Sequence, residues 1–63
     1  MKVGAKIKRE RNKIGLTQCE LAEKVGISRT YLSDIENDRS NPSFLMVTRI
    51  ANALEISLSI LEN

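Results

Sequence analysis

The sequence contains no histidine and no tryptophan, and it has only one cysteine, one proline, one tyrosine and one phenylalanine. Without histidine, and without carboxylates grouped at ligand spacing, the chain cannot build a zinc site, a Cys-His nucleophile or a Ser-His-Asp triad. The single cysteine, Cys19, has no partner for an internal disulfide, so stability must come from helix packing. We therefore expect a protein that is not an enzyme and that holds neither a metal nor a cofactor.

Long apolar runs are also absent. The longest one, residues 44–47, has four residues, whereas a membrane span needs about 20 and the apolar core of a signal peptide about 7 to 15. We therefore expect no membrane partner and a cytoplasmic location.

The composition is that of one small folded domain. Hydrophobic residues make up 41% of the 63 residues and charged residues 29%, which is too apolar for a disordered chain. A domain of this size buries only about 60% of its unfolded surface, so we predict a single core and a single domain over residues 1–63. The net charge is only +2, but residues 1–14 carry six Lys or Arg against one Glu. Positive charge is therefore concentrated at the N-terminal end of the chain.

The first helix is predicted over residues 3–14. Its apolar residues recur at helical spacing, and they are Val3, Ile7 and Ile14. Arg11 completes the same stripe, and Gly15 follows as a stop signal. An arginine in this position leaves two alternatives: its stem lies along the core with the guanidinium in water, or the guanidinium has a partner in the chain.

Residues 17–36 are predicted to form a helix-turn-helix. Thr17 and Glu20 form a T-x-x-E capping box at the start of the second helix. Gly26 ends that helix after two turns, and Ser28 caps the third helix, which continues to the end of this segment. At about 100° per residue, the face of the third helix opposite its apolar residues carries three polar side chains, namely Thr30, Ser33 and Asp34.

Two more helices are predicted after the connection that follows residue 36. Ser43 caps the fourth helix, whose apolar positions are Phe44, Val47, Ile50, Ala51 and Leu54. Ser57 caps a short fifth helix with Leu58 and Leu61 on one side. No segment alternates as a strand would, so the predicted fold is all-α, a compact bundle of five short helices.

The capping residues, the turn glycine and the core spacing combine into a pattern over nearly the whole chain. Its segments are Leu16-Thr17-Gln18, Glu20-Leu21-Ala22, Val25-Gly26-Ile27-Ser28, Tyr31-Leu32-Ser33, Ile35-Glu36-Asn37, Pro42-Ser43, Ile50-Ala51 and Ala53-Leu54. This pattern resembles the phage repressor and Cro-like helix-turn-helix DNA-binding domains, the XRE-type transcriptional regulators. The resemblance implies a lambda-repressor-like bundle in which the second and third helices form the helix-turn-helix.

In that family the third helix lies in the major groove, with its first turns at the base edges. The resemblance therefore implies four base-reading residues, Arg29, Thr30, Ser33 and Asp34. Arg29 is placed to donate two hydrogen bonds to a guanine. Thr30 either meets a base or only starts the helix. Asp34 either accepts a hydrogen bond from cytosine or adenine, or holds Arg29 or Thr30 in place.

The resemblance also implies contacts to DNA phosphates, from Gln18, Tyr31, Asn37, Arg39 and Ser40. Gln18 opens the second helix, whose N-terminus favours an anion. For the three residues after the third helix the alternative is ordinary loop polarity, and for Tyr31 it is a half-buried core position. In related domains an arginine of the first helix pairs with the glutamate that ends the third, which implies an ion pair between Arg11 and Glu36.

Two residues depart from the family pattern, because glycine is usual after the third and fourth helices where this chain has Asp38 and Glu55. Asp adopts the left-handed conformation tolerably well. At Glu55 either the helix ends differently or about 1 kcal/mol of strain is accepted.

These features predict a sequence-specific regulator that binds double-stranded DNA as a homodimer on a pseudo-palindromic operator, with no small-molecule ligand. Predicted dimer contacts are Leu58, Ile60 and Leu61, the monomer core being the alternative for the two leucines. The competing hypothesis is a protein-interaction module, antitoxin-like or adaptor, which Asp34 and the low net charge favour. The salt dependence of DNA affinity distinguishes the two.

Overall fold

Five helices make up most of the part of the chain that the computed structural model describes, residues 3–62. They are α1 (Gly4–Lys13), α2 (Gln18–Val25), α3 (Arg29–Glu36), α4 (Phe44–Leu54) and α5 (Leu58–Leu61). No strand occurs among these residues, and the predicted all-α fold of five short helices is confirmed. None of the five helices is long and apolar enough to cross a membrane.

The starts of the helices follow the predicted capping residues. At α2 the Glu20 backbone N–H donates to Thr17 Oγ1 at 3.1 Å, and the Thr17 N–H donates to Glu20 Oε1 at 2.8 Å, which completes the capping box. The hydroxyl of Ser28 caps α3, and that of Ser43 caps α4. Each cap satisfies a backbone donor that the first helical turn leaves without a partner.

The ends of α2 and α4 both use the left-handed conformation. Gly26 has a φ of 87°, which glycine adopts without steric cost. Glu55 has a φ of 58° and closes α4 as glycine does in the family pattern. Of the two alternatives for Glu55 the structure therefore contains the strained one. Asp38 is the other non-glycine residue in this region among those described, with a φ of 59°.

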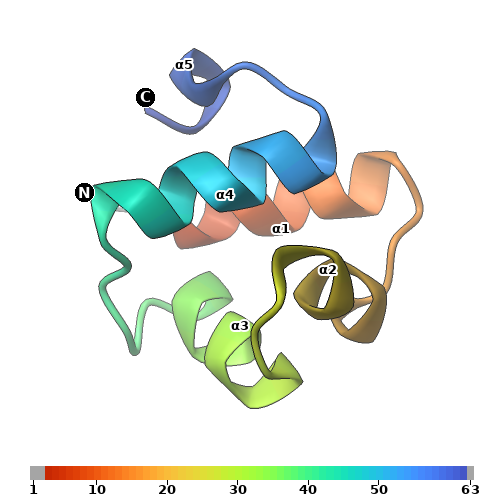
Figure 1. Cartoon of the computed structure of the whole chain (residues 1–63), viewed down its shortest axis with the longest axis vertical. Helices are drawn as coiled ribbons and strands as arrows, with labels where there is room; N and C mark the ends of the chain where they lie inside the picture. Colours follow the sequence, from red (N-terminus) through yellow and green to blue (C-terminus); the bar gives the residue numbers. More distant parts are fainter. Residues whose placement is uncertain (1–2, 63) are drawn as a thin grey trace.

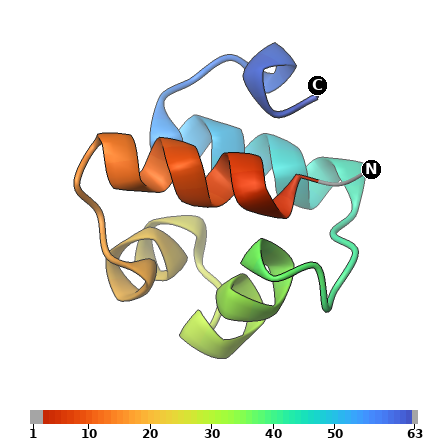
Figure 2. The same ribbon diagram turned by 180° about the vertical axis from the view of Figure 1, so that it is seen from behind.

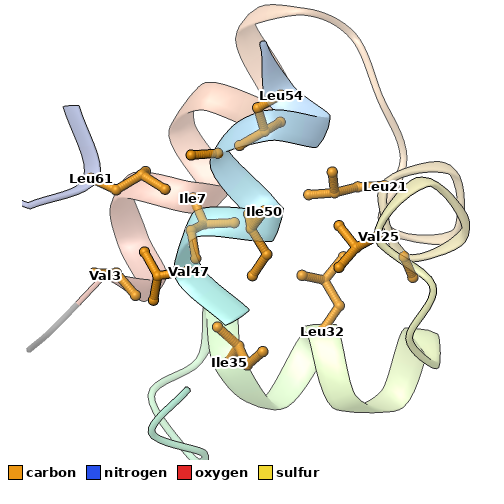
Figure 3. Packing of buried hydrophobic residues seen from close by; sticks show 12 residues of the cluster. Val3, Ile7, Leu21, Val25, Leu32, Ile35, Val47, Ile50, Leu54 and Leu61 are labelled. Atoms are coloured by element: carbon orange, nitrogen blue, oxygen red, sulfur yellow. The ribbon is translucent and has the colours of Figure 1, made fainter. Parts of the chain in front are cut away.

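The helices pack around α1 and α4, which lie against each other in the middle of the bundle (Figures 1 and 2). The α2–α3 pair lies on one side of them and α5 on the other. Side chains from all of these helices meet in one core (Figure 3). Its members are Val3, Ile7, Leu21, Ala22, Val25, Leu32, Ile35, Val47, Ile50, Ala51, Leu54 and Leu61.

Three predicted positions differ in the structure. Phe44 and Ile14 were expected on core-facing stripes, but they are 62% and 51% exposed. Each lies at a helix end beyond the turns that the core covers, Phe44 as the first residue of α4 and Ile14 as the residue after α1. Leu61 was predicted as a dimer contact, but none of its surface is exposed. Leu61 is corrected to a residue of the monomer core, because α5 turns it inward onto α1 and α4.

Candidate functional site

The α2–α3 pair is fixed by the core, and α2 is also fixed by a hydrogen bond from Arg49 of α4. Leu21 and Val25 of α2 point toward Leu32 of α3 in the core (Figure 3). From α4, Arg49 Nη2 donates a hydrogen bond of 2.6 Å to the backbone oxygen of Val25, at the C-terminus of α2. A cation is favourable at this end of a helix, where carbonyl groups lack partners. The angle between α2 and α3 is therefore held by contacts with a third helix.

A buried ion pair connects α1 to the C-terminus of α3. Arg11 Nε donates to Glu36 Oε2 at 2.8 Å, and Arg11 Nη2 donates to Glu36 Oε1 at 3.0 Å. The Arg11 and Glu36 side chains are only 8% and 1% exposed. Arg11 Nη1 also donates to the backbone oxygen of Leu16 at 2.8 Å. Of the two alternatives for Arg11, the structure has the partnered guanidinium and not one that extends into water.

Gln18 joins this ion pair to the start of α3. Its Nε2 donates to Glu36 Oε1 at 3.0 Å, and its Oε1 accepts a 3.4 Å hydrogen bond from Arg29 Nη1. We call the four residues Arg11, Glu36, Gln18 and Arg29 the brace network. Because an amide nitrogen carries two hydrogens, one donor of Gln18 is left for a ligand. The sequence indicated the ion pair only through the family resemblance, and it gave no signal for the position of Gln18 between two charged residues.

The outward side of α3 is polar along its whole length. Thr30 is exposed, and Ser33 and Asp34 are half-buried. At the end of the helix, Asn37 Nδ2 donates to the backbone oxygen of Ser33 at 2.8 Å and approaches Ser33 Oγ at 3.4 Å. We call these four residues, Thr30, Ser33, Asp34 and Asn37, the outward strip. The amide of Asn37 thus closes α3 in this structure.

Asp34 has a partner that the sequence did not suggest. Its carboxylate Oδ1 lies 3.7 Å from Arg39 Nη1, whereas the sequence suggested Arg29 or Thr30. The backbone oxygen of Asp34 also accepts hydrogen bonds from the N–H groups of Arg39 and Ser40, at 2.8 and 3.2 Å. These bonds turn the chain back along α3 and place Arg39 beside it.

Tyr31 lies between the candidate site and the core. Its side chain is half-buried and packs against the core cluster. This position fits the alternative of a core tyrosine, and it leaves part of the residue in solvent.

Positive charge on α1 is partly neutralised by a buried carboxylate. Glu10 is 7% exposed, and its Oε2 accepts a 3.1 Å hydrogen bond from Arg9 Nε and lies 3.4 Å from Lys13 Nζ. Burial by itself raises the pKa of the Glu10 carboxyl, but the hydrogen bonds and charges of Arg9 and Lys13 together hold that pKa below its ordinary value. The sequence showed a basic segment without indicating this cluster.

Apolar side chains are exposed at two helices on the α4–α5 side. Ile60 is 40% exposed on α5, and Leu58 is half-buried against the core. At the start of α4, Phe44 and its neighbour Leu45 are 62% and 68% exposed. Of the predicted dimer contacts, only Ile60 and part of Leu58 are therefore accessible.

Known proteins share this arrangement. A family model described as helix-turn-helix matches residues 7–61. The immunity repressor protein of Bacillus phage phi105 is 51% identical over 59 residues, which cover 94% of this chain and 41% of the repressor. The transcriptional regulator SinR of Bacillus licheniformis is 39% identical over 62 residues, which cover 97% of this chain and 56% of SinR. The chain therefore spans about half the length of these curated relatives or less.

The similarity extends to solved structures. SinR, described as the master regulator for biofilm formation and solved in complex with DNA, matches with a TM-score of 0.89 and 35% identity. The match covers 97% of this chain and 98% of that one. The predicted resemblance and the helix-turn-helix formed by α2 and α3 are thereby confirmed. The relatives are transcriptional regulators and not enzymes.

Proposed function

Since the chain belongs to the helix-turn-helix family, we propose that it is a sequence-specific regulator of transcription that binds double-stranded DNA with α3 in the major groove. The observation that carries this proposal is the brace network. It ties the first residues of α2 and α3 to each other through Gln18 and Arg29, and it anchors both to a buried ion pair. A rigid start of α3 is what a helix needs to present side chains to base edges at fixed positions.

The base-reading residues in this proposal are Arg29, Thr30 and Ser33. Arg29 lies in the first turn of α3 with its guanidinium in solvent, and Gln18 holds one of its nitrogens. The other nitrogens remain able to donate two hydrogen bonds to guanine O6 and N7. Thr30 and Ser33 follow on the same side of the helix, where a thymine methyl group or a base edge would meet them.

The proposed phosphate contacts lie at both ends of this surface. The N-terminus of α2 supplies backbone N–H groups and the positive end of a helix dipole. Gln18 lies at the same helix end, and the second hydrogen of its amide nitrogen is available for a phosphate oxygen. At the other end of α3, the side chain of Arg39 is 70% exposed. Its positive charge makes it the strongest candidate there for a phosphate contact. Asn37 and Ser40 are weaker candidates, because the Asn37 amide and the Ser40 N–H already form internal hydrogen bonds. Tyr31 is weaker because its side chain is half-buried against the core.

We further propose that two copies bind a pseudo-palindromic operator with half-sites about 34 to 36 Å apart. Three base-reading residues specify too short a sequence for one copy to select a site. The exposed Ile60 of α5, with part of Leu58, is the proposed contact between copies. Sedimentation of Ile60→Asp tests this contact, with Ile14→Asp as the matched control because Ile14 is an exposed isoleucine on another part of the surface. Equal dimer content in both variants would rule the contact out.

Selection of bound duplexes from a random DNA pool tests the main proposal. We expect a two-fold related consensus and an affinity that falls steeply with added salt, because each phosphate contact releases counterions. If the chain binds no duplex even at low salt, the proposal fails.

The alternative is a protein-interaction module with the same fold. The observation that favours it is the pair of adjacent exposed residues Phe44 and Leu45, since exposed apolar neighbours are typical of protein contacts. The affinity for a protein partner bound at these two residues would depend only weakly on the salt concentration. The same salt titration therefore distinguishes the two functions.

A further inference from the structure

A carboxylate lies in the middle of the surface that the proposed function turns toward DNA. Asp34 belongs to the outward strip of α3, with Arg29 at the start of the helix and Arg39 beyond its end. A carboxylate beside DNA repels the phosphates unless it accepts a hydrogen bond from a base or has a cation of its own. In this structure its cation is Arg39.

The position of this pair follows from the backbone. The chain turns at Asp38, whose φ is 59°. The N–H of Arg39 then donates to the backbone oxygen of Asp34 at 2.8 Å, and the Ser40 N–H donates to the same oxygen at 3.2 Å. These two bonds hold Arg39 next to the last turn of α3. The guanidinium is thus kept within reach of Asp34 in the free protein.

The side-chain pair itself is loose. The separation of 3.7 Å between Asp34 Oδ1 and Arg39 Nη1 is longer than a hydrogen bond. The Arg39 side chain is 70% exposed and that of Asp34 35%. Ion pairs of this kind contribute little to folding stability, and salt screens them. Arg39 can therefore leave Asp34 for another anion without unfolding any part of α3.

We propose that Asp34 and Arg39 form an exchangeable pair, in which Asp34 competes with a DNA phosphate for the Arg39 guanidinium and so sets the affinity for every duplex. Asp34 is then a positioning residue for Arg39 and does not read a base. This inference rests on the proposed function, because it assumes that α3 faces DNA. Its consequence is that Asp34 weakens binding to every duplex by about the same modest factor, while Arg29, Thr30 and Ser33 set the preference among bases.

The exchange has a definite signature in the salt dependence. When Arg39 moves from Asp34 to a phosphate, the DNA releases a counterion, and this release is the same with or without the carboxylate, because a single carboxylate condenses no counterion. Added salt screens the attraction between Asp34 and Arg39, so the competition by Asp34 is strongest at low salt and fades as the salt concentration rises. Removal of the charge from Asp34 should therefore raise the affinity most at the lowest salt and steepen the slope of log K against log salt by less than one.

The test compares Asp34→Asn with the wild-type chain on two labelled duplexes, the selected sequence and a scrambled one, at several KCl concentrations from about 50 to 200 mM. We expect Asp34→Asn to bind both duplexes about two- to fivefold more tightly at the lowest salt, as expected for loss of a competing surface ion pair. The gain should shrink as salt is added, so the slope should become steeper by less than one on both duplexes. Base preference in a selection experiment should not change.

Three further variants separate the pair from general charge effects. The double variant Asp34→Asn with Arg39→Ala should bind DNA no more tightly than Arg39→Ala alone, because Asp34 then has no guanidinium to compete for. Asp38→Asn and Glu62→Gln remove one negative charge each, the first next to Arg39 in the chain and the second directly after α5. Helix α5 lies on the opposite side of the bundle from α3 (Figure 1). Neither substitution should steepen the slope as Asp34→Asn does. Thermal unfolding of Asp34→Asn should stay within a few degrees of the wild-type chain.

The possible results are distinct. Weaker binding by Asp34→Asn, or lost preference at one base pair, would show that Asp34 reads a base and would overturn the inference. An equal gain in the presence and absence of Arg39 would overturn it as well, because general repulsion would then be the cause. If neither the wild-type chain nor Asp34→Asn binds any duplex at low salt, the proposed function fails and this inference with it. If the wild-type chain binds with steep salt dependence but Asp34→Asn does not differ, only this inference fails.

Discussion

Arg11 and Glu36 meet as a buried, two-hydrogen-bond ion pair between the first helix and the last residue of α3. Both groups are almost completely withdrawn from water, and both have further partners, since Arg11 also donates to Leu16 and Glu36 also accepts from Gln18. The desolvation of the two charges is therefore offset by these four hydrogen bonds and by a fifth, of 3.3 Å, from Arg11 Nη1 to Asn12 Oδ1. Loss of either charge would leave the other one buried without compensation.

Arg11→Met should accordingly lower the free energy of unfolding by about 3 to 5 kcal/mol. Urea denaturation, followed by circular dichroism, measures this loss. The double variant Arg11→Met with Glu36→Leu should recover part of it, because no unpaired charge then remains in the interior. An unchanged denaturation midpoint for Arg11→Met would contradict the assigned role of the pair.

Arg29→Ala should weaken binding to the selected duplex by about 1 to 3 kcal/mol and abolish preference at one base pair. The physical reason is the loss of two donors that are placed for a guanine. Arg9→Ala is the matched control, since Arg9 is an exposed arginine of α1. Fluorescence anisotropy on the consensus and on single-base variants measures both effects. A loss of equal size on all sequences would make Arg29 a phosphate contact.

Leu32→Ala should destabilise the fold by about 2 to 5 kcal/mol, because Leu32 is fully buried where α2, α3 and α4 meet. Phe44→Ala removes more side-chain atoms, but Phe44 is 62% exposed, so the change should stay within about 0.5 kcal/mol. Thermal melts of the two variants give the comparison. Similar losses in both would mean that Phe44 is covered in solution.

Glu55→Gly should stabilise the fold by about 1 kcal/mol, because glycine adopts the left-handed conformation that Glu55 holds at a φ of 58°. Glu55→Gln serves as the control, since it removes the charge and keeps the backbone strain. A rise in melting temperature for glycine alone would identify the backbone as the cause. Equal shifts in the two variants would identify the charge instead.

Stability should fall in acid through Glu10. The pKa of its carboxyl lies below the ordinary value of 4.5, so the folded state favours the ionised form. This contribution is present above pH 4.5 and is lost as the pH falls through the lower folded pKa. Glu10→Gln should therefore show a flatter decline of melting temperature below pH 4.5 than the wild-type chain. A parallel decline in the two proteins would assign the acid sensitivity to other carboxylates.

The sequence predicted the helices well because the signals for them are local. A capping box, a serine before each of α3, α4 and α5 and a glycine at the end of α2 act over three or four residues, and each of them recurs in the structure. The bounds of α3 and α4 were predicted as observed, and α1 is one residue shorter at each end. At Glu55 the family pattern marked the position as unusual and left two alternatives open, and the structure has the left-handed one.

Side-chain partners were predicted less well, since they depend on how distant segments meet. Phe44 fits the apolar stripe of α4, but which turn of a helix is covered depends on the placement of its neighbours. Asp34 finds Arg39 only because the chain reverses at Asp38. Gln18 reaches Glu36 across 18 positions. The Arg11–Glu36 pair was anticipated only because related domains have one.

Under the proposed function, the shared acceptor at Glu36 also has a consequence for the kind of DNA that the chain should prefer. A single carboxylate receives α1 through Arg11 and α2 through Gln18, while it belongs to α3 itself. These hydrogen bonds hold α1, α2 and α3 in fixed positions relative to one another, so the helices cannot shift separately to fit a straight duplex. Any misfit must then be relieved by bending or twisting of the DNA, whose stiffness varies with sequence. Operators with flexible steps between the contacted bases should bind more tightly, even though no side chain touches those steps.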